Sequence, residues 1–177
     1  MALKHLTSSV FVFRRFTGGW RTGLIRHPRL HKMMIPGGHV EPGETSAEAA
    51  LREVAEETSL AVTLVSPPAA PVPDGYRGRR VALPWWIAEY QVKPDNHLGV
   101  AHVHVDYLYV ALADGTAPGL ACGTAGHPFG WYAAGDLAGL DMFDDARVLA
   151  VPLLAGLANG ADTVGAAAAL VEGLSQA

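Results

Sequence analysis

The carboxylates of this 177-residue chain are concentrated in one short stretch. Six of its eight glutamates lie between residues 37 and 60, in the sequence GGHVEPGETSAEAALREVAEETSL. At 100° per residue, Glu53, Glu56 and Glu57 occupy one arc of about 100° on a helix. Such spacings destabilise a helix by about 0.2–0.5 kcal/mol per like-charged pair, which a solvated acidic face tolerates. The alternative to such a face is a binding site for a hard divalent cation, which prefers oxygen ligands.

Two features of the sequence favour the cation. The rest of the chain is poor in glutamate, so a generally acidic surface does not account for the concentration. Gly37 and Gly38 precede the glutamates, and a backbone without Cβ can approach a ligand closely and turn a carbonyl toward it. Proteins bind Mg²⁺ through a few carboxylates, and water and substrate phosphates fill the other coordination positions of the ion. The stretch therefore predicts a Mg²⁺ site.

The spacing of these residues resembles a known family motif. Gly38 is followed after five residues by Glu44 and after seven more by REVAEETSL, residues 52–60. This resembles the Nudix box of the Nudix (MutT-like) hydrolases: Gly, five residues, Glu, seven residues, Arg-Glu, an aliphatic, any residue, Glu-Glu, any residue, Gly and an aliphatic. Residues 38–60 match at every defined position except Ser59, where the family has glycine.

The resemblance implies a hydrolase in which water attacks the pyrophosphate of a nucleoside diphosphate linked to another moiety. Mg²⁺ would be the cofactor, with Mn²⁺ as a substitute. The implied metal ligands are Gly38, through its carbonyl, Glu53, Glu56 and Glu57. The implied catalytic residues are Glu53, as a ligand or the general base, and the pair Arg52 and Glu44, in which the arginine orients the carboxylates.

Other functions and several substrates remain open. A Nudix-like nucleotide-binding or regulatory module is one alternative, although a pure sensor has no need of the full set of glutamates. An isoprenyl-diphosphate isomerase-type enzyme is another, because the same fold hosts it. Nucleoside triphosphates, dinucleoside polyphosphates, ADP-ribose and nucleotide sugars are all candidate substrates.

Outside the box, a histidine-rich strand is the next candidate for chemistry. In AHVHVDYLYVAL, alternation places His102, His104 and Asp106 on one face. That face either supplies a further metal ligand or base, or is a half-exposed sheet face. His104 and Asp106 are the candidates for substrate contact, and Asp106 suits a hard metal better than imidazole does. Asp95 and His97, in a loop, are weaker candidates for an extra ligand.

Adjacent aromatic residues provide the remaining candidates. Trp85 and Trp86 start a strand, where successive side chains point to opposite faces, so one of them is free to stack on a base or ring. Packing in the core is the alternative for both. Arg77, Arg79 and Arg80 lie in a proline-rich loop, where they either hold phosphate or are solvated.

Composition bounds the class of protein. A formal charge of −4 argues against a large basic face for nucleic acid, and half of the residues are hydrophobic, without an uninterrupted apolar run of membrane-spanning length. We expect a small nucleotide-type substrate and neither nucleic acid nor a membrane as partner, with a homodimer left open. The single cysteine, Cys122, is consistent with a cytoplasmic location.

The elements that must position the glutamates are readable in part. We expect a hairpin over residues 8–26, a helix over about 46–58, strands near 60–66, 84–92, 102–112 and 128–132, and a helical tail over about 143–177. Thr45 and Glu48 fit a capping box at the start of the first helix. The resemblance implies one domain over residues 1–177, of the α+β class: a Nudix-type α/β/α sandwich with a central mixed β-sheet flanked by helices.

Overall fold

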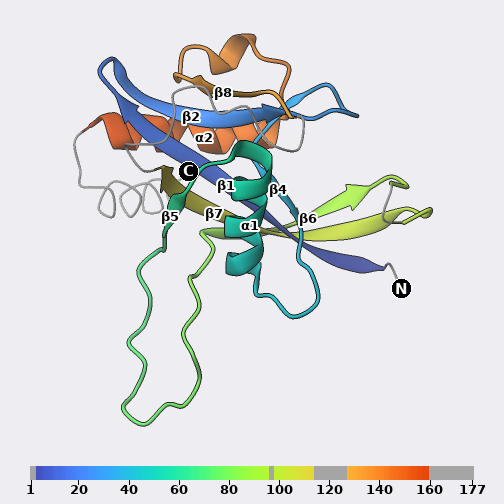
Figure 1. Ribbon diagram of the computed structural model, residues 1–177, viewed down its shortest axis with the longest axis vertical. Helices are drawn as coiled ribbons and strands as arrows, with labels where there is room; N and C mark the ends of the chain where they lie inside the picture. Colours follow the sequence, from blue (N-terminus) through green and yellow to red (C-terminus); the bar gives the residue numbers. More distant parts are fainter. Residues whose placement is uncertain (1–2, 96–97, 114–126, 160–177) are drawn as a thin grey trace.

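The computed structural model describes residues 3–95, 98–113 and 127–159. Within them the chain forms one mixed sheet, two α-helices and a short 3-10 helix (Figure 1). The elements are β1 (Lys4–Phe16), β2 (Gly19–Arg26), β3 (Met33–Met34), β4 (Gly37–His39), α1 (Ser46–Thr58), β5 (Val62–Val65), β6 (Trp86–Val92), β7 (His102–Ala113), β8 (Phe129–Tyr132), η1 (Leu137–Gly139) and α2 (Asp144–Ala158).

Two long strands, β1 and β7, form the centre of the sheet. They pair in parallel from Lys4 opposite Val103 to Phe13 opposite Leu112. On its other edge β1 pairs first with β4 and then with β2, both antiparallel, and β7 pairs in the same way with β6 and then β5. This parallel pair among antiparallel neighbours makes the sheet mixed, as expected.

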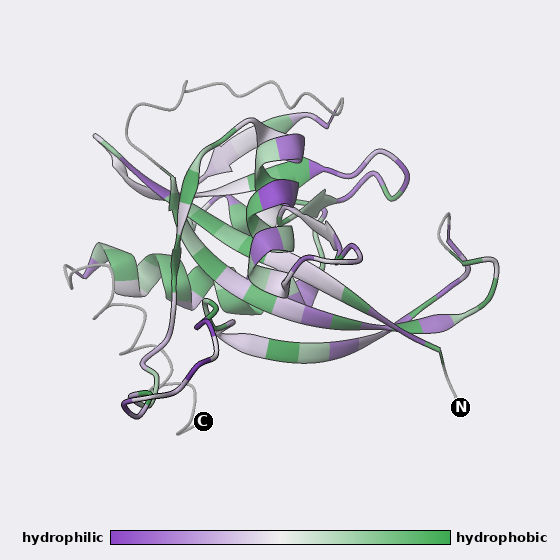
Figure 2. Ribbon diagram, turned by 60° about the horizontal axis from the view of Figure 1, so that its bottom comes forward, coloured by the Kyte–Doolittle hydropathy of each residue, from purple (hydrophilic) through white to green (hydrophobic). Residues whose placement is uncertain are grey.

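The two helices cover opposite faces of the sheet. Alternate residues of β1 and β7 point to α1, whose buried positions include Ala47, Ala50 and Val54; the strand residues on that side are Val10, Val12, Tyr109 and Ala111. The intervening residues of β1 and β7 point to α2; they are Phe11, Phe13, Leu108 and Val110. The residues of α2 that pack against them are Ala150, Leu153, Leu154 and Leu157. The α/β/α sandwich is therefore confirmed, and the exposed side of α1 is hydrophilic (Figure 2).

Helix α1 begins and ends through local contacts. Thr45 Oγ1 accepts a hydrogen bond from the Glu48 amide at 3.2 Å, and Glu48 Oε2 accepts one from the Thr45 amide at 2.8 Å, so the expected capping box is present. After the last turn, Ser59 adopts the left-handed conformation, with φ 58°, and its amide donates to Ala55 O. Serine therefore takes the conformation for which glycine is preferred, at a cost of about 1–2 kcal/mol.

The sheet differs from expectation mainly at its edges. β1 begins at Lys4, four residues before the expected hairpin, because its first part pairs with β4 and β7 rather than with β2. Residues 66–85 connect β5 to β6 and include the expected proline-rich loop, which extends away from the sheet (Figure 1). Trp85 precedes β6 rather than starting it, and it lies in the core. The second part of the expected helical tail, beyond residue 159, lies outside the described residues, as do His97 and Cys122. No helix in the described part of the chain is long and apolar enough to cross a membrane.

Candidate functional site

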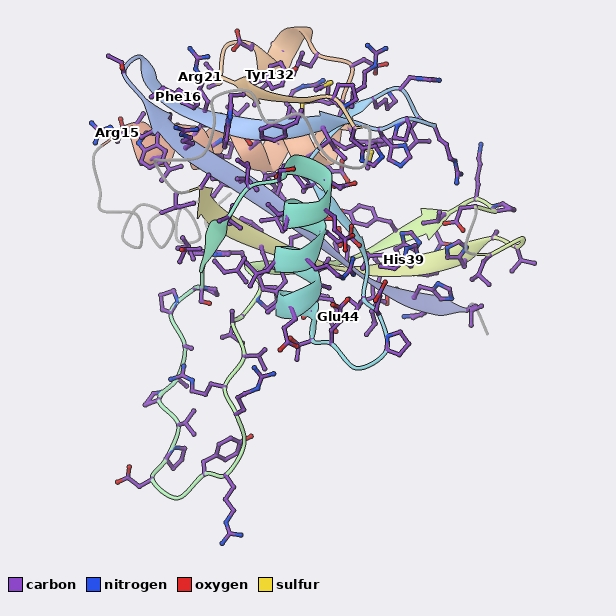
Figure 3. The ribbon with its side chains drawn as sticks, in the orientation of Figure 1. Arg15, Phe16, Arg21, His39, Glu44 and Tyr132 are labelled. Carbon is purple, nitrogen blue, oxygen red and sulfur yellow. The ribbon has the colours of Figure 1, made fainter. Side chains whose placement is uncertain are left out.

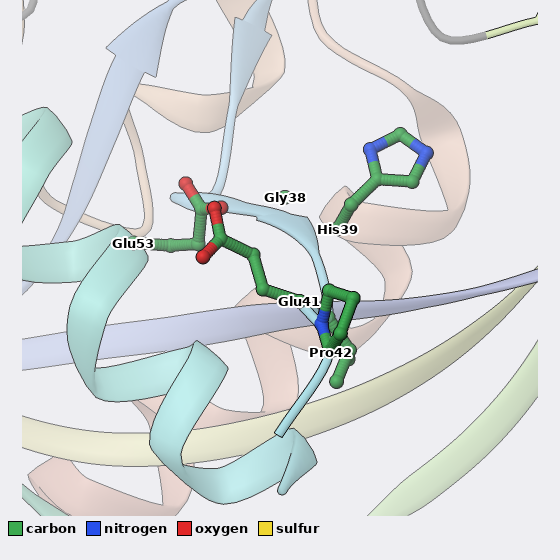
Figure 4. Close-up of a pocket in the computed structure, with 6 residues that line it drawn as sticks. Gly38, His39, Glu41, Pro42 and Glu53 are labelled. Atoms are coloured by element: carbon green, nitrogen blue, oxygen red, sulfur yellow. The ribbon is translucent and has the colours of Figure 1, made fainter. Parts of the chain in front are cut away.

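The site is built where β4 meets α1. The short strand β4 is held against β1, with Gly38 opposite Ser8, and the loop after it leads into α1. The Gly37 amide donates to Glu57 Oε2 at 3.0 Å. A Cβ on Gly38 would lie only 2.3 Å from Glu53 Oε1, so the carboxylate of Glu53 occupies the space that any side chain at residue 38 would need (Figure 4). The two glycines therefore let the strand and the acidic face of α1 meet closely.

One guanidinium, that of Arg52, connects the glutamates. Its Nε and Nη2 donate to the two oxygens of Glu44, at 3.2 and 2.8 Å, which is the pairing that the Nudix box implies. Its Nη1 donates to Glu53 at 2.8 Å and to Glu56 at 3.3 Å, and Nη2 also donates to the backbone oxygen of His39 at 2.9 Å. Arg52 thus ties the β4–α1 loop to α1 and orients two of the three carboxylates. Two of its partners, His39 and Glu44, are labelled in Figure 3.

The glutamates around Arg52 differ in burial, and their pKa values differ accordingly. Glu57 is 7% exposed, and burial raises its pKa to about 8, with further increases from the charges of Glu53 and Glu56 and an opposing hydrogen bond from Gly37. Burial also raises the pKa of Glu53, against the hydrogen bond and charge of Arg52. The hydrogen bond from Arg52 lowers the pKa of Glu44. The groups around Glu53 and Glu57 therefore do not offset the cost of burying these carboxylates in their charged forms.

Glu57 has a partner that the sequence did not reveal. His127, just before β8, places Nδ1 at 3.1 Å from Glu57 Oε1, and its ring stacks on His27. Burial lowers the pKa of His27, and the nearby charges of His127 and Arg29 lower it further. Seventy positions separate Glu57 from His127, and no local signal joins them.

The charges of Glu53 and Glu56 act on Glu57, but the three carboxylates do not converge on one point among the described residues. Among the described residues, the group of His, Cys, Asp and Glu ligand atoms lying within 4.8 Å of one another comprises His39, Asp95, His102 and His104. Glu53 and Glu56 instead contact Arg52, and Glu57 contacts Gly37 and His127. A cation at the glutamates would replace some of these contacts.

A groove of about 890 Å³ lies beside the glutamates, on the α2 side of the sheet. Its size is in the range of small-molecule sites. It shares Gly38 and His39 with a smaller open pocket of about 440 Å³ that Glu53 lines. The strands and α2 contribute the polar groups of the groove, which include Thr7, Ser9, Tyr90, His104, Asp106 and Asp145. Burial raises the pKa of Tyr90 to about 12.

Two of the predicted substrate-binding residues line this groove. His104 and Asp106 project into it from β7, and Thr7 Oγ1 donates to Asp106 Oδ1 at 3.0 Å. Asp106 is buried, which raises its pKa, although hydrogen bonds from Ser9 and Thr7 oppose the increase. The face that His102, His104 and Asp106 share is therefore covered rather than half-exposed: His102 and Asp106 are buried and His104 is partly so.

Of the two tryptophans, Trp85 lies in the core and Trp86 is partly buried against it. Trp85 is 9% exposed, and its indole N–H donates to the backbone oxygen of Val65. Trp86 packs edge-on against Phe11, with ring centroids 6.3 Å apart. Neither residue lines the groove or the smaller pocket. Pairing of β6 with β7 places both rings over the apolar layer beneath α2.

Comparison with known proteins identifies the family. The model of the NUDIX domain matches residues 4–149. A NUDIX-family hydrolase from Clostridium perfringens is 26% identical, with a TM-score of 0.64 over 83% of this chain and 93% of that one.

Two further solved structures share the fold at lower identity. The dihydroneopterin triphosphate pyrophosphohydrolase of E. coli is 16% identical, with a TM-score of 0.57 over 89% of this chain and 99% of that one. The NUDIX domain of Shewanella oneidensis NrtR, solved with ADP ribose, is 18% identical, with a TM-score of 0.56 over 85% and 86% of the two chains. No curated protein gives a significant match. The family model spans most of the chain, which therefore belongs to the Nudix family of hydrolases acting on phosphorus-containing anhydrides in nucleoside diphosphate derivatives.

Proposed function

We propose that this protein is a Mg²⁺-dependent pyrophosphohydrolase whose catalytic centre is formed by the Nudix-box glutamates. The observation that carries the proposal is the balance of charge around Arg52. Its single guanidinium is shared by Glu44, Glu53 and Glu56. Glu57, the residue after Glu56, is buried and has no share of it. Carboxylates that are crowded and desolvated in this way are stabilised when a cation binds among them.

The donor atoms present fit a hard cation. Glu53, Glu56 and Glu57 offer only oxygen, as does the carbonyl of Gly38, and this is the set that Mg²⁺ or Mn²⁺ prefers to a softer metal. When bound, such a cation supplies charge neutralisation for the phosphates and acidifies a water molecule. Nudix enzymes use divalent metals. The residues of this chain therefore suit the cofactor.

The protein side chains have distinct proposed roles. Arg52, held by Glu44 and by the backbone of His39, positions Glu53 and Glu56. Glu53, at the wall of the smaller pocket, is a metal ligand or accepts the proton of the attacking water. Glu57, with one oxygen fixed by the Gly37 amide, is a ligand whose orientation is set by β4.

We place the remainder of the substrate in the groove on the α2 side. The groove is adjacent to the box, because Gly37, Gly38 and His39 form part of its wall. Tyr90 and Asp106 offer a donor and an acceptor to a base or a sugar. The proposed substrate is therefore a small nucleotide such as a nucleoside triphosphate or a nucleotide sugar, and a cytoplasmic location forms part of the same proposal.

The experiment is a panel of phosphoanhydrides incubated with the protein and Mg²⁺, with products separated by chromatography. The panel contains nucleoside triphosphates, nucleotide sugars, a dinucleoside polyphosphate, ADP-ribose, dihydroneopterin triphosphate and isopentenyl diphosphate. We expect cleavage of at least one compound and a loss of at least 100-fold in Glu57→Gln, as befits removal of a group from a catalytic centre. Glu89→Gln is the matched control, because Glu89 lies on β6 in an exposed ion pair with Lys4.

The same panel separates the alternatives. A regulatory module would bind ADP-ribose or another nucleotide without any product appearing. An isomerase would instead convert isopentenyl diphosphate without releasing phosphate. No product from folded protein across the panel, or full activity in Glu57→Gln, would contradict the proposed hydrolase.

A further inference from the structure

A cluster of three histidines and one aspartate lies beside the groove, whose lining includes His39, Asp95 and His104 but none of the Nudix-box glutamates. His39 ends β4, Asp95 lies in the connection from β6 to β7, and His102 and His104 lie two residues apart on β7. One ligand atom from each of the four lies within 4.8 Å of the others. The sheet brings them together, because β1 pairs with both β4 and β7, placing Thr7 opposite both His39 and Asp106. We call this set the histidine cluster.

Backbone groups orient two members of the histidine cluster. The carbonyl of Val100 lies 3.0 Å from His102 Nδ1 and can only accept, so the hydrogen of a neutral His102 ring is on Nδ1. The Nε2 lone pair is then directed at the cluster. The Leu98 amide donates to Asp95 Oδ1 at 2.9 Å, which leaves Oδ2 toward the histidines. Hydrogen bonds of this kind, to the outer atoms of ligands, are the usual second layer of a metal site.

The spacing of the inner atoms fits a small cation. Tetrahedral Zn²⁺ with bonds of about 2.0–2.1 Å holds its ligand atoms about 3.4 Å apart. The two Nε2 atoms of His102 and His104 are 3.0 Å apart, and Asp95 Oδ2 is 3.5 Å from the first and 3.9 Å from the second. These separations differ from a tetrahedral edge by about half an ångström or less.

The chemistry of the donors distinguishes this cluster from the glutamates. Three imidazoles and one carboxylate suit Zn²⁺ and its neighbours in the transition series, whereas oxygen-only ligands suit Mg²⁺. One member, His102, is 1% exposed, and the ring of His5 packs against it with centroids 5.2 Å apart, whereas the other three line the groove. Four protein ligands would complete a tetrahedral shell, which is the arrangement of a structural site rather than a catalytic one.

We propose that His39, Asp95, His102 and His104 bind a transition-metal ion of the Zn²⁺ type, at a site separate from the Nudix-box glutamates. The ion ties the connection between β6 and β7 to β4, and so fixes the wall of the groove next to Gly38. This inference does not depend on the proposed pyrophosphohydrolase activity.

Co²⁺ is the probe that tests this site, because a tetrahedral Co²⁺ complex absorbs strongly in visible light and an octahedral one does not. Untagged protein is stripped with a chelator, dialysed and titrated with Co²⁺, and Zn²⁺ is then added as competitor. We expect one equivalent of tetrahedral Co²⁺, its displacement by one equivalent of Zn²⁺, and a higher thermal midpoint in the Zn²⁺-loaded protein.

Substitutions inside and outside the histidine cluster test which residues bind the ion. Asp95→Asn and His104→Gln are expected to weaken Zn²⁺ binding at least tenfold and to remove the rise in thermal midpoint. Two controls should bind as the natural protein does: His31→Asn removes an exposed imidazole elsewhere and suits its positive φ of 55°, and Glu56→Gln alters the box. An octahedral spectrum, no stoichiometric binding, unchanged binding in both cluster variants, or loss of binding in Glu56→Gln would each overturn the proposal.

Discussion

Gly38→Ala is the sharpest test of how the strand and helix form the site. A methyl group at residue 38 would lie 2.3 Å from Glu53 Oε1 and 2.5 Å from its Cδ. Ordinary contact begins at 3.4 Å, so the carboxylate must move by about 1 Å. The displaced atoms are the end of a flexible side chain, and residue 38 has no positive φ, so the fold itself should tolerate the change.

The expected result is a catalytic defect without a matching loss of stability. A misplacement of about 1 Å in a catalytic group can reduce the rate by about 100-fold. We therefore expect kcat/KM to fall by one to two orders of magnitude, while the free energy of unfolding changes by less than about 1 kcal/mol. Turnover is measured with the most active compound of the substrate panel, and stability by urea unfolding.

Gly37→Ala is the matched control. A Cβ at residue 37 would lie 2.5 Å from the backbone oxygen of Ser8 and 2.8 Å from the Cα of Ser9, so β4 itself would have to separate from β1. This variant should lose about 1–3 kcal/mol of stability.

A second comparison uses Glu53→Gln. If Gly38→Ala acts through Glu53, combining the two changes should cost little more than Glu53→Gln alone. Full activity in Gly38→Ala, or a loss of stability equal to that of Gly37→Ala, would refute the reasoning.

Substitutions at three further positions test the fold. The hydrogen bond from the Thr45 backbone lowers the pKa of Glu48 from 4.5 to about 2, so its contribution to stability is present above pH 4.5 and is lost as the pH falls toward 2; urea unfolding at several pH values should show wild type and Glu48→Gln converging over that range. Ser59→Gly should raise the free energy of unfolding by up to about 1 kcal/mol and Ser59→Val should lower it, because residue 59 has a φ of 58°; equal effects of the two would contradict this cause. Leu154→Ala, at a position 3% exposed beneath the sheet, should lower the free energy of unfolding by about 2–5 kcal/mol and leave kcat at 25 °C unchanged in the folded protein.

Local patterns predicted the parts of the site that depend on neighbours in the sequence. The capping box of Thr45 and Glu48 spans three residues, and the pairing of Arg52 with Glu44 spans eight, so motif and helical periodicity were sufficient. The left-handed conformation of Ser59 is the one for which the family motif has glycine, but the sequence alone does not determine how a helix ends at a serine.

The parts that could not be predicted depend on strand register. Alternation placed His102, His104 and Asp106 on one face, but only the pairing of β1 with both β4 and β7 brings His39 to them. The indole of Trp85 is buried because its backbone amide and β5 both bond to β7, which places it against Val65, twenty residues earlier. The contact of His127 with Glu57 likewise spans seventy residues and has no counterpart in the sequence pattern.

The parallel pairing of β1 with β7 has a consequence for the order in which the protein can form. β1 contains four consecutive residues that are fully buried, Val10 to Phe13, and their parallel partners run from Tyr109 to Leu112. About a hundred residues must leave the ribosome before these strands can meet, and contacts of such long range make folding slow. The nascent chain therefore carries an apolar segment without its partner through most of its synthesis. We expect the yield of native protein to rise when translation is slowed at low temperature or when chaperones that bind extended apolar segments are abundant.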